Sequence, residues 1–464
     1  MKVNRSRRRV LKATGVAATV GLGTAGCIGA DDNGSGSGQT VDVGNLGTLE
    51  ASEEVEIDFW ISIGAQELAQ RIADGFNEQS ETITVSVSEE GDYTEVWNQT
   101  QQSQVAGDPP GIVHLNAIHT LPAWAEDVVI PAERLIGSEI DRRNFVDAVN
   151  NYYIIEDSLL GLPFGVSSVA CTYNRTAFEA AGLPAHPDDV ELRTMADWKQ
   201  ASEALVSETD TDHGATWPKI GWFYETYHAL LGQNVLNNDN GRAAPATESY
   251  LDSQASRRIY EWNKEMYDAE YYQLTQEWSD ARQAFLNGQS AIELDSSAAL
   301  AGLAGGAADA GFEAGVGTVP TDAESGREGK IVGGGALFVP TGVDGPKLEA
   351  AAEFMLWMAQ PEQQAEWHMS TGYYPARTDA IEVAEQQGFY EQAPQFRRAF
   401  EQFTDRTESS ATAGVFTYDH SEIRSEITNG LDRLYAGDPV EDVLASTKTS
   451  VDSVLDRASD ADPR

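Results

Sequence analysis

Apolar and polar residues alternate along this chain with two different periods, and the two periods follow one another in a regular order. An apolar stretch at residues 55–63 predicts a buried strand, and the alternation at residues 82–88 predicts a strand with one buried face. Between them, Leu68, Ile72 and Phe76 share one face of an amphipathic helix. A strand, a helix and a strand at this spacing predict a parallel sheet with crossover helices.

The same order of elements recurs along the rest of the chain, and the C-terminal third is mainly helical. Further strands are predicted at residues 111–118, 165–173, 290–295 and 331–340, and further helices at residues 93–105, 174–183, 281–286 and 348–359. The body of roughly 400 residues exceeds what one hydrophobic core organises. We therefore expect an α/β fold of two lobes.

The N-terminus has the pattern of an export signal. Residues 6–12 read SRRRVLK, a short apolar run of small residues follows at 13–25, and Cys27 ends a TAGC sequence. The run is too short to span a bilayer, so the pattern favours a signal over an anchor helix. The paired arginines resemble a twin-arginine signal, and TAGC resembles a lipobox whose cysteine is lipidated. The alternative is an ordinary basic start without export function.

These two signatures predict a twin-arginine lipoprotein signal at residues 1–27 and lipidation of Cys27. The Gly/Ser/Asp-rich residues 28–52 lack apolar periodicity, and we expect a flexible tether there. The protein would then be exported folded and held by its lipid on the extracellular face of the cytoplasmic membrane.

The charge of the chain is strongly acidic and evenly spread. Its 74 acidic and 31 basic residues give a formal net charge of -43 at pH 7. Self-repulsion on this scale is relieved at molar salt, where the Debye length falls to about 3 Å. We therefore expect a salt-loving source of the haloarchaeal kind. Nucleic acid is a poor partner, because no basic patch is present to neutralise phosphates.

The sequence offers little chemistry outside binding. Cys171 lies in an apolar stretch and is expected to be a buried free thiol, since Cys27 is assigned to lipid. The histidines are scattered without metal-ligand spacing, so neither a metal nor another cofactor is predicted. We find no nucleophile elbow and no phosphate-binding loop, which argues against a surface phosphoesterase.

Four segments carry a resemblance to a known family. They read NRTAFEAAGLP, FLNGQSAIELDSS, VPTGVDGPKLEAAAEFMLWMAQPEQQAEW and AEWHMSTGYYPARTDAIEVAEQQGFYEQAP. Together they resemble the extracellular solute-binding proteins of ABC importers, and the last is similar to the sn-glycerol-3-phosphate-binding subfamily. The resemblance implies a periplasmic-binding-protein-like fold, in which crossing strands form a hinge and the ligand binds in a cleft between lobes.

The resemblance also implies where the lobes divide. Lobe I would comprise residues 53–167 plus 295–335, and lobe II residues 168–294 plus 336–458. The chain would cross between lobes at residues 165–172, near Asp295 and at residues 335–340.

The subfamily's ligand contacts map onto positions of this chain. Two tyrosines, two serines, a glycine and an arginine match them: Tyr93, Tyr373, Ser167, Ser296, Gly334 and Arg424. Two positions depart, since Ala117 stands where the subfamily has a glutamate and Met195 where it has a tryptophan. The anion-binding half would be kept and the polyol half altered, which implies broader tolerance toward phosphorylated polyols and glycerophosphodiesters.

Each matched residue also has a structural alternative. Tyr373 is compatible with a core position, the triple glycine around Gly334 with a bulge, and Arg424 with an exposed pair to Glu422 or Glu426.

The leading hypothesis for function is a monomeric transport receptor that delivers a small anionic polyol or sugar to ABC permease subunits. A neutral sugar binder is the alternative, because Trp60, Trp97, Trp124, Trp217 and Trp222 could supply stacking surfaces. A sensory receptor is a further alternative.

Overall fold

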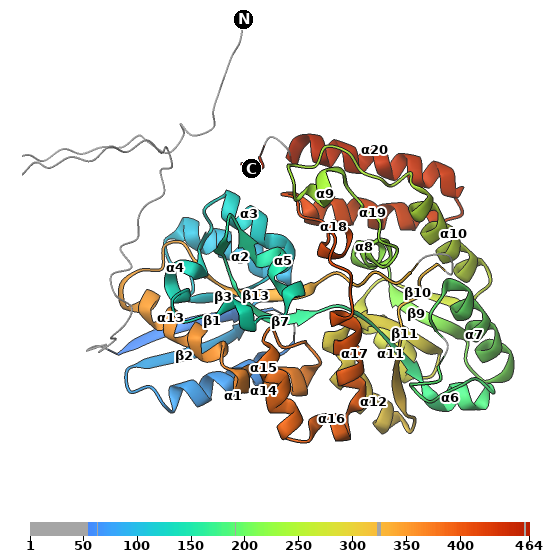
Figure 1. The fold of residues 1–464 in the computed structure, drawn as a ribbon, viewed down its shortest axis with the longest axis horizontal. Coiled ribbons are helices and arrows are strands. Elements are labelled where there is room, and N and C mark those ends of the chain that lie inside the picture. Colours follow the sequence, from blue (N-terminus) through green and yellow to red (C-terminus); the bar gives the residue numbers. More distant parts are fainter. Residues whose placement is uncertain (1–53, 63, 191, 323–325, 459–460) are drawn as a thin grey trace, which may run out of the picture. The chain divides into compact units, whose positions relative to one another are not determined.

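The computed structural model describes residues 54–62, 64–190, 192–322, 326–458 and 461–464 (Figure 1). The chain divides into two units, Met1–Asp42 and Val43–Arg464, and all described residues belong to the second. The predicted signal, Cys27 and the tether at 28–52 therefore lie outside the described residues.

The first sheet contains six strands and forms the centre of lobe I. Its strands are β1 (Val55–Ile61), β2 (Ile83–Glu89), β3 (Ile112–Asn116), β4 (Val129–Ile130), β7 (Leu162–Ser167) and β13 (Gly333–Pro340). The order is β2-β1-β3-β13-β4, and β7 also pairs with β13. β1 runs parallel to β2 and β3, whereas β13 is antiparallel to its neighbours.

Four long helices pack against this sheet. They are α1 (Gln66–Asn77), α2 (Tyr93–Ala106), α13 (Gly345–Met358) and α14 (Pro361–Thr371). α2 begins at a capping box, in which the Asp92 side chain accepts from the Glu95 amide and the Glu95 carboxylate accepts from the Asp92 amide. This cap fixes Tyr93 as the first residue of the helix.

The second sheet contains five strands and forms the centre of lobe II. Its strands are β8 (Val169–Asn174), β9 (His213–Pro218), β10 (Tyr272–Thr275), β11 (Ser290–Ser296) and β12 (Ala314–Gly317), in the order β10-β9-β11-β8-β12. β9 is parallel to β10 and β11, and β8 is antiparallel to β11 and β12. The fold is thus the expected α/β arrangement of two lobes.

The helices of lobe II surround this sheet and pack on one another. The longer ones are α7 (Met195–Glu208), α8 (Gly221–Leu230), α10 (Gln254–Asp268), α11 (Trp278–Leu286), α12 (Leu300–Ala310), α17 (Pro394–Thr404), α19 (His420–Tyr435) and α20 (Val440–Ala458). Across the described ranges, no helix is long and apolar enough to cross a membrane.

Shorter elements connect these parts. They are α3 (Thr120–Ala125), α4 (Ala132–Ile136), α5 (Asn150–Tyr153), α6 (Arg175–Ala180), α9 (Asn237–Gly241), α15 (Thr378–Gln386), α16 (Phe389–Gln392), α18 (Ser410–Ala413), the hairpin β5 (Ile154–Ile155) and β6 (Ser158–Leu159), and 3-10 helices that include η2 (Ala117–His119) and η5 (Ser297–Ala299).

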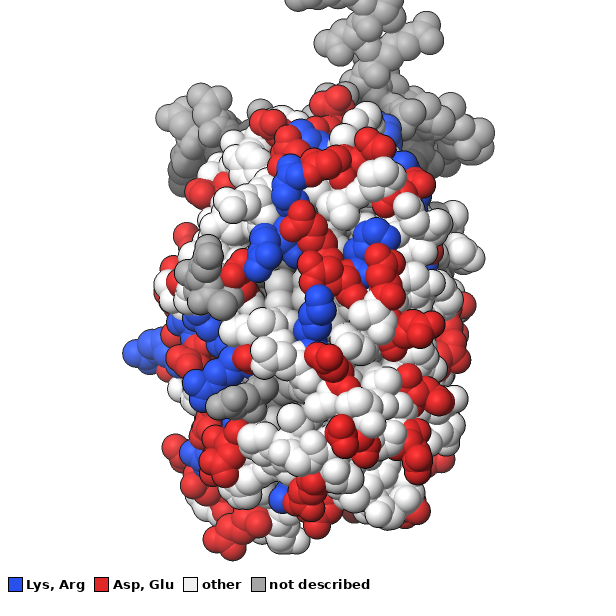
Figure 2. Space-filling model, turned by 90° about the vertical axis from the view of Figure 1, so that its right-hand side faces the viewer, with Lys and Arg blue, Asp and Glu red and all other residues white. Residues whose placement is uncertain are grey.

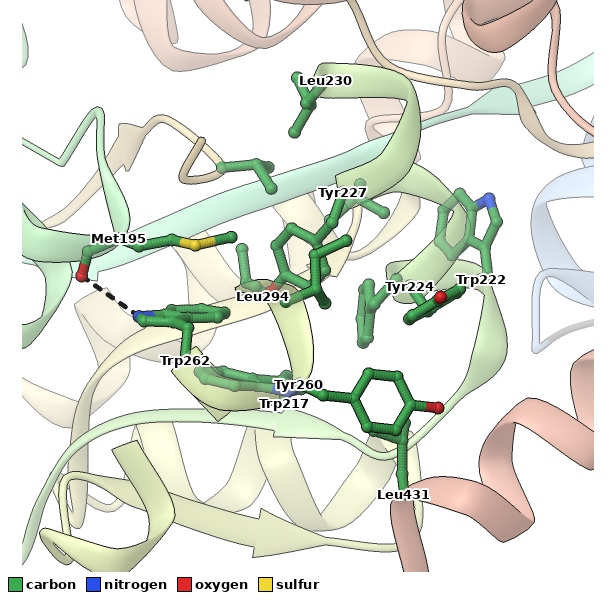
Figure 3. Packing of buried hydrophobic residues seen from close by; sticks show 14 of the residues in the cluster. Met195, Trp217, Trp222, Tyr224, Tyr227, Leu230, Tyr260, Trp262, Leu294 and Leu431 are labelled. Atoms are coloured by element: carbon green, nitrogen blue, oxygen red, sulfur yellow. Dashed lines mark hydrogen bonds between the residues drawn. The ribbon is translucent and has the colours of Figure 1, made fainter. Parts of the chain in front are cut away.

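The core of lobe II is rich in aromatic residues (Figure 3). The rings of Trp217 and Trp262 stack with their centroids 5.5 Å apart, and Trp198 meets Trp217 edge-on at 6.1 Å. Cys171 is a buried free thiol in this core, and burial raises its pKa above the usual range. The thiol therefore packs as a small apolar group.

Between β7 and β13, the chain crosses from one sheet to the other at two places. Ser168 alone separates β7 in the first sheet from β8 in the second, and residues 318–332 lead back from β12 to β13. The amide of Ser297 donates to the Ser168 carbonyl at 2.8 Å, so the end of β11 lies against the first crossing.

The predicted crossing near Asp295 is wrong, and the lobe boundaries differ accordingly. After Asp295 the chain stays in lobe II through η5, α12 and β12, whereas the resemblance implies lobe I for residues 295–335. β13 belongs to the first sheet and α13 packs on β1, whereas the resemblance implies lobe II for residues 336–458. β13 is buried along its whole length, and such a pattern does not show which sheet a strand joins.

Candidate ligand-binding site

Ser167 and Gly334 lie together where the first crossing leaves the first sheet. Ser167 ends β7 and pairs with Gly333 of β13, and a β-bulge follows between Gly334 and Gly335. Gly334 has a φ of +77°, and a Cβ there would clash with the carbonyl oxygen of Gly165. Only glycine therefore permits this close approach of two backbones.

Trp222, from lobe II, packs against Gly333. A Cβ at Gly333 would overlap the Trp222 ring and lie 3.0 Å from the Ser167 Oγ. The indole Nε1 of Trp222 is buried without a hydrogen-bond partner among the described residues. Buried donors are rarely left unpaired, so this N–H is a candidate donor to a ligand.

Tyr373 and Ser296 lie close to the first crossing as well. Gly372, with a φ of +104°, ends α14, and a Cβ there would clash with the carbonyl oxygen of Ser297. This close packing holds Tyr373 near the end of β11. The Tyr373 carbonyl accepts from His368 Nδ1 at 2.7 Å, and the Ser296 side chain accepts from the Ala298 amide at 3.2 Å.

The phenol of Tyr93 lies near that of Tyr373. Its hydroxyl is buried and makes no hydrogen bond of good geometry to a described residue. Burial raises the pKa of Tyr93 to about 12, although the nearby side chains of Tyr373 and Ser62 oppose the shift. Both phenols therefore stay protonated, and the Tyr93 hydroxyl can donate to an anion.

Arg424 enters the region from α19, and it is not an exposed helix residue. Its Nε and Nη2 donate to the two carboxylate oxygens of Glu225 on α8, at 3.0 and 2.7 Å. Glu225 is 1% exposed and also bonds His420 Nε2 at 2.8 Å. Burial opposes ionisation of Glu225, but the charges of Arg424 and His420 lower its pKa to about 2. The surface alternative is wrong, since Glu422 pairs with Arg457 instead.

Ala117 faces the same region from lobe I. It opens η2, which contacts α19, and it is 2% exposed. Two residues on, His119 stacks on Trp97 at 5.2 Å, and burial together with the charges of Arg424 and His420 lowers the pKa of His119 to about 3. Ala117 therefore lies on a lobe I element that contacts α19, the lobe II helix that carries Arg424.

Met195 is not brought to this junction. It is the first residue of α7 and packs in the aromatic core of lobe II, where its carbonyl accepts from Trp262 Nε1 at 3.2 Å (Figure 3). Trp217, one of the tryptophans considered for sugar stacking, lies in the same core. Met195 is therefore not a candidate ligand contact, although its position in the sequence matches one in the subfamily.

The residues that the structure does bring together are called the junction site below. They are Tyr93, Ala117, Ser167, Trp222, Ser296, Gly334, Tyr373 and Arg424. Tyr93, Ala117, Ser167 and Gly334 come from lobe I, whereas Trp222, Ser296 and Arg424 come from lobe II. A polar ligand held there would contact both lobes.

Two α/β lobes with a polar site at their junction define the class of solute-binding receptors. The family described as "Bacterial extracellular solute-binding protein" matches residues 71–398. The chain therefore belongs to the extracellular solute-binding proteins.

Two relatives at the level of sequence are sn-glycerol-3-phosphate-binding periplasmic proteins. The sn-glycerol-3-phosphate-binding periplasmic protein UgpB of Pectobacterium atrosepticum is 26% identical over 419 residues, which is 88% of this chain and 91% of that protein. UgpB of Escherichia coli strain K12 is also 26% identical and covers 82% of this chain and 88% of its own length.

Solved structures show the same fold. UgpB of Mycobacterium tuberculosis, in complex with glycerophosphocholine, superimposes with a TM-score of 0.74 at 20% identity and covers 87% of this chain and 99% of that one. The GacH receptor of Streptomyces glaucescens, solved with and without acarbose, gives a TM-score of 0.72 at 18% identity and the same coverage.

Proposed function

We propose that this protein captures sn-glycerol 3-phosphate, or a related phosphorylated polyol or glycerophosphodiester, and delivers it to ABC permease subunits. The observation that carries the proposal is the set of donors at the junction site. Among the described residues, the Trp222 N–H and the Tyr93 hydroxyl are buried without hydrogen-bond partners. Trp222 packs against Gly333, and the half-buried Arg424 lies on the same side of the junction. A phosphate offers several acceptor oxygens, and donors of this kind fit it.

The electrostatics of the site favour hydrogen bonding over net charge. Arg424 is matched by Glu225, so this pair adds no net positive charge. Arg424 donates to Glu225 through Nε and Nη2, so its Nη1 can donate to a further acceptor. Glu225 thereby orients Arg424, and the neutral donors of the junction site supply further contacts with the phosphate.

Lobe closure follows from the placement of these donors. Tyr93, Ser167 and Gly334 belong to lobe I, whereas Trp222 and Arg424 belong to lobe II. A ligand that bonds both groups stabilises the closed arrangement over the open one by that difference in contacts. The closed, loaded form is then the one that a permease would recognise.

Ala117 supports tolerance toward larger ligands. The subfamily resemblance places a glutamate there, which would accept hydrogen bonds from a glycerol moiety. Alanine is smaller than glutamate and has no carboxylate, so a diester with a further head group meets no carboxylate there. Met195 contributes nothing to this argument, because it lies in the core of lobe II.

A ligand panel tests the proposed function. Thermal unfolding in molar salt would be followed with sn-glycerol 3-phosphate, glycerophosphocholine, inorganic phosphate and maltose. A ligand at 100 times its Kd stabilises the folded state by about 2.7 kcal/mol, which raises Tm measurably. We expect the two glycerol phosphates to raise Tm and maltose to leave it unchanged.

A neutral sugar is the second candidate ligand, and one observation favours it. Trp222 and Trp97 both lie at the junction of the lobes, where indole rings can stack on sugars. A rise in Tm with maltose alone would favour this alternative over the phosphate ligand.

We further infer export by the twin-arginine route and lipid anchoring through Cys27, from the SRRRVLK and TAGC sequences. Cys27→Ala should release the protein into the medium or leave it unprocessed, and replacing Arg7 and Arg8 by lysine should block export. Cell fractionation measures both. Mature protein that stays membrane-bound without Cys27 would refute the anchor, and normal export of the lysine variant would refute the route.

A further inference from the structure

A second arginine–carboxylate pair lies beside the junction site. Arg282 on α11 donates through Nε to Asp295 Oδ2 at 2.6 Å and through Nη2 to Asp295 Oδ1 at 3.1 Å. Asp295 immediately precedes Ser296 and also accepts from the Ser296 amide at 2.5 Å. The pair therefore holds the guanidinium at the end of β11, next to a junction-site residue.

The surroundings of Arg282 connect it to the other side of the site. Its guanidinium carbon lies 5.9 Å from the Trp278 ring centroid, and that ring is 6.3 Å from Trp222. The Arg282 and Asp295 charges are also close enough to Tyr373 to shift the ionisation of its phenol. Arg282 thus lies against Trp278, which in turn packs on Trp222, and close to Ser296 and Tyr373.

The geometry leaves one edge of this guanidinium open. Asp295 engages Nε and Nη2, and Nη1 has no acceptor among the described residues. The Arg282 side chain is 40% exposed, whereas Asp295 is 2% exposed. The carboxylate holds one edge of the arginine from the buried side, and the other edge is available to an acceptor.

A second buried carboxyl, Glu293, lies beside this pair. It is fully buried two residues before Asp295, on the same face of β11, and its carboxyl oxygens have no donor among the described residues. Burial, reinforced by the charge of Asp295, raises the pKa of Glu293 well above its usual range. Burial also raises the pKa of Asp295, so the buried position opposes a full negative charge on both carboxyls beside Arg282.

We propose that Arg282 is a second cationic contact for the phosphate of the ligand, with Asp295 as its positioning residue. The inference rests on the proposed function, because it concerns the same ligand. In this proposal Arg282 strengthens the binding of a phosphate monoester more than that of a diester. A monoester carries a charge of about -1.5 to -2 at pH 7, and a diester carries only one. The additional charge needs a cation besides Arg424.

The test compares Arg282→Gln with Arg397→Gln by calorimetric titration. Arg397 on α17 is a matched control, since its side chain is 41% exposed and is likewise paired with carboxylates. The titrants are sn-glycerol 3-phosphate and glycerophosphoglycerol. We expect Arg282→Gln to weaken monoester binding about tenfold or more and diester binding at most about threefold, a difference set by the lost charge contact. Arg397→Gln should bind both like the wild type.

The pH profile separates a charge contact from a structural role. The second proton of a monoester leaves near pH 6, so wild-type affinity for glycerol 3-phosphate should rise between pH 5 and 8. Arg282→Gln should flatten this rise, and Arg282→Lys should restore part of it. The groups that face Arg282 are Asp295 and Glu293 on β11 and Tyr373 after α14, and Cys171 on β8 is also close to Glu293.

Three outcomes would overturn the inference while leaving the proposed function intact. They are equal binding by the two glutamine variants, an equal loss for both ligands in Arg282→Gln, and an unchanged pH profile in that variant. Absence of glycerol 3-phosphate binding by the wild type would instead refute the proposed function itself.

Discussion

At the scale of single residues, two buried ionisable side chains differ in whether they have a partner. Glu225 is held by Arg424 and His420, so its charge is compensated. Lys330, which is 1% exposed, has no hydrogen-bond partner for its Nζ among the described residues. Burial, with a further contribution from the charge of Arg327, lowers the pKa of Lys330 from 10.5 to about 7. The cost of removing this amine from water is therefore not offset.

Replacing Lys330 should stabilise the protein. The unfolded chain keeps its proton up to about pH 10.5, and the folded chain loses it near pH 7, so wild-type stability should rise with pH across this window. Lys330→Met should increase the free energy of unfolding at pH 7 by on the order of 3 kcal/mol and remove that rise. Denaturant unfolding at several pH values measures both effects.

The exposed Lys347 provides the control for this prediction. Lys347→Met removes the same charge from the surface and should change the free energy of unfolding by less than about 0.5 kcal/mol. If the Lys330 variant is less stable than the wild type, or keeps the same rise with pH, the amine has a partner or access to water.

Part of the junction site was predictable from single residues and part was not. Tyr93, Ser167, Gly334 and Tyr373 stand in local motifs, and the structure brings them together. The pairing of Arg424 with Glu225 spans 199 positions, and no local pattern indicates a partner at that separation. The Trp222 N–H lacks a partner among the described residues because the folded chain buries it. The sequence alone therefore presents Trp222 only as one of five candidate tryptophans.

At the scale of elements, the glycine run of β13 packs tightly on β7 within lobe I and on Trp222 of lobe II. The strand approaches β7 so closely that Gly334 adopts a positive φ beside the Gly165 carbonyl, and Gly333 leaves room for Trp222. Gly334 is therefore needed for its backbone conformation, and Gly333 for close packing against Trp222.

Alanine substitutions separate these two demands. Gly334 has a φ of +77° and a crowded Cβ position, whereas Gly107, after α2, has a φ of +79° and open space around it. Gly107→Ala should cost about 1–2 kcal/mol from backbone strain alone. Gly334→Ala should cost clearly more and abolish ligand binding, as unfolding and calorimetry would measure. Equal costs for the two variants would mean that the contact with Gly165 is unimportant.

Most elements follow from the hydrophobic pattern, but their assignment to lobes does not. The strands at β1, β2, β3, β8, β11 and β13 lie where the periodicity predicts them. β12 has the sequence AGVG and only four residues, so its weak signal concealed that the chain remains in lobe II after β11. Which sheet a strand joins depends on long-range pairing that alternation does not encode.

At the scale of the whole molecule, charge dominates the surface. The formal net charge is -43, and Figure 2 shows acidic side chains spread over the viewed face with basic ones between them. Many of the arginines form pairs with carboxylates, such as Arg71 with Glu366 and Arg175 with Glu313. Isolated surface pairs of this kind contribute at most about 1 kcal/mol each, so they do not offset the general repulsion.

Stability should therefore increase with salt. Raising KCl from about 0.1 to 1 M shortens the Debye length from about 10 to 3 Å and screens the repulsion between surface carboxylates. We expect Tm to rise by several degrees over this range, measured by circular dichroism without ligand. A Tm that is constant or falls with salt would contradict the proposed adaptation to high salt.

The central claim is that donors from both lobes, Trp222 among them, hold a phosphate ligand at the junction site. The most direct measurement is a calorimetric titration of sn-glycerol 3-phosphate into the wild type and Trp222→Phe, a variant that keeps an aromatic ring and loses the N–H. The account predicts saturable one-to-one binding by the wild type and a loss of about tenfold or more in the variant, since a hydrogen bond to a charged group contributes about 1.5–3 kcal/mol. Equal affinity of the two proteins, or heat on titration with maltose but with no phosphate compound, would contradict it.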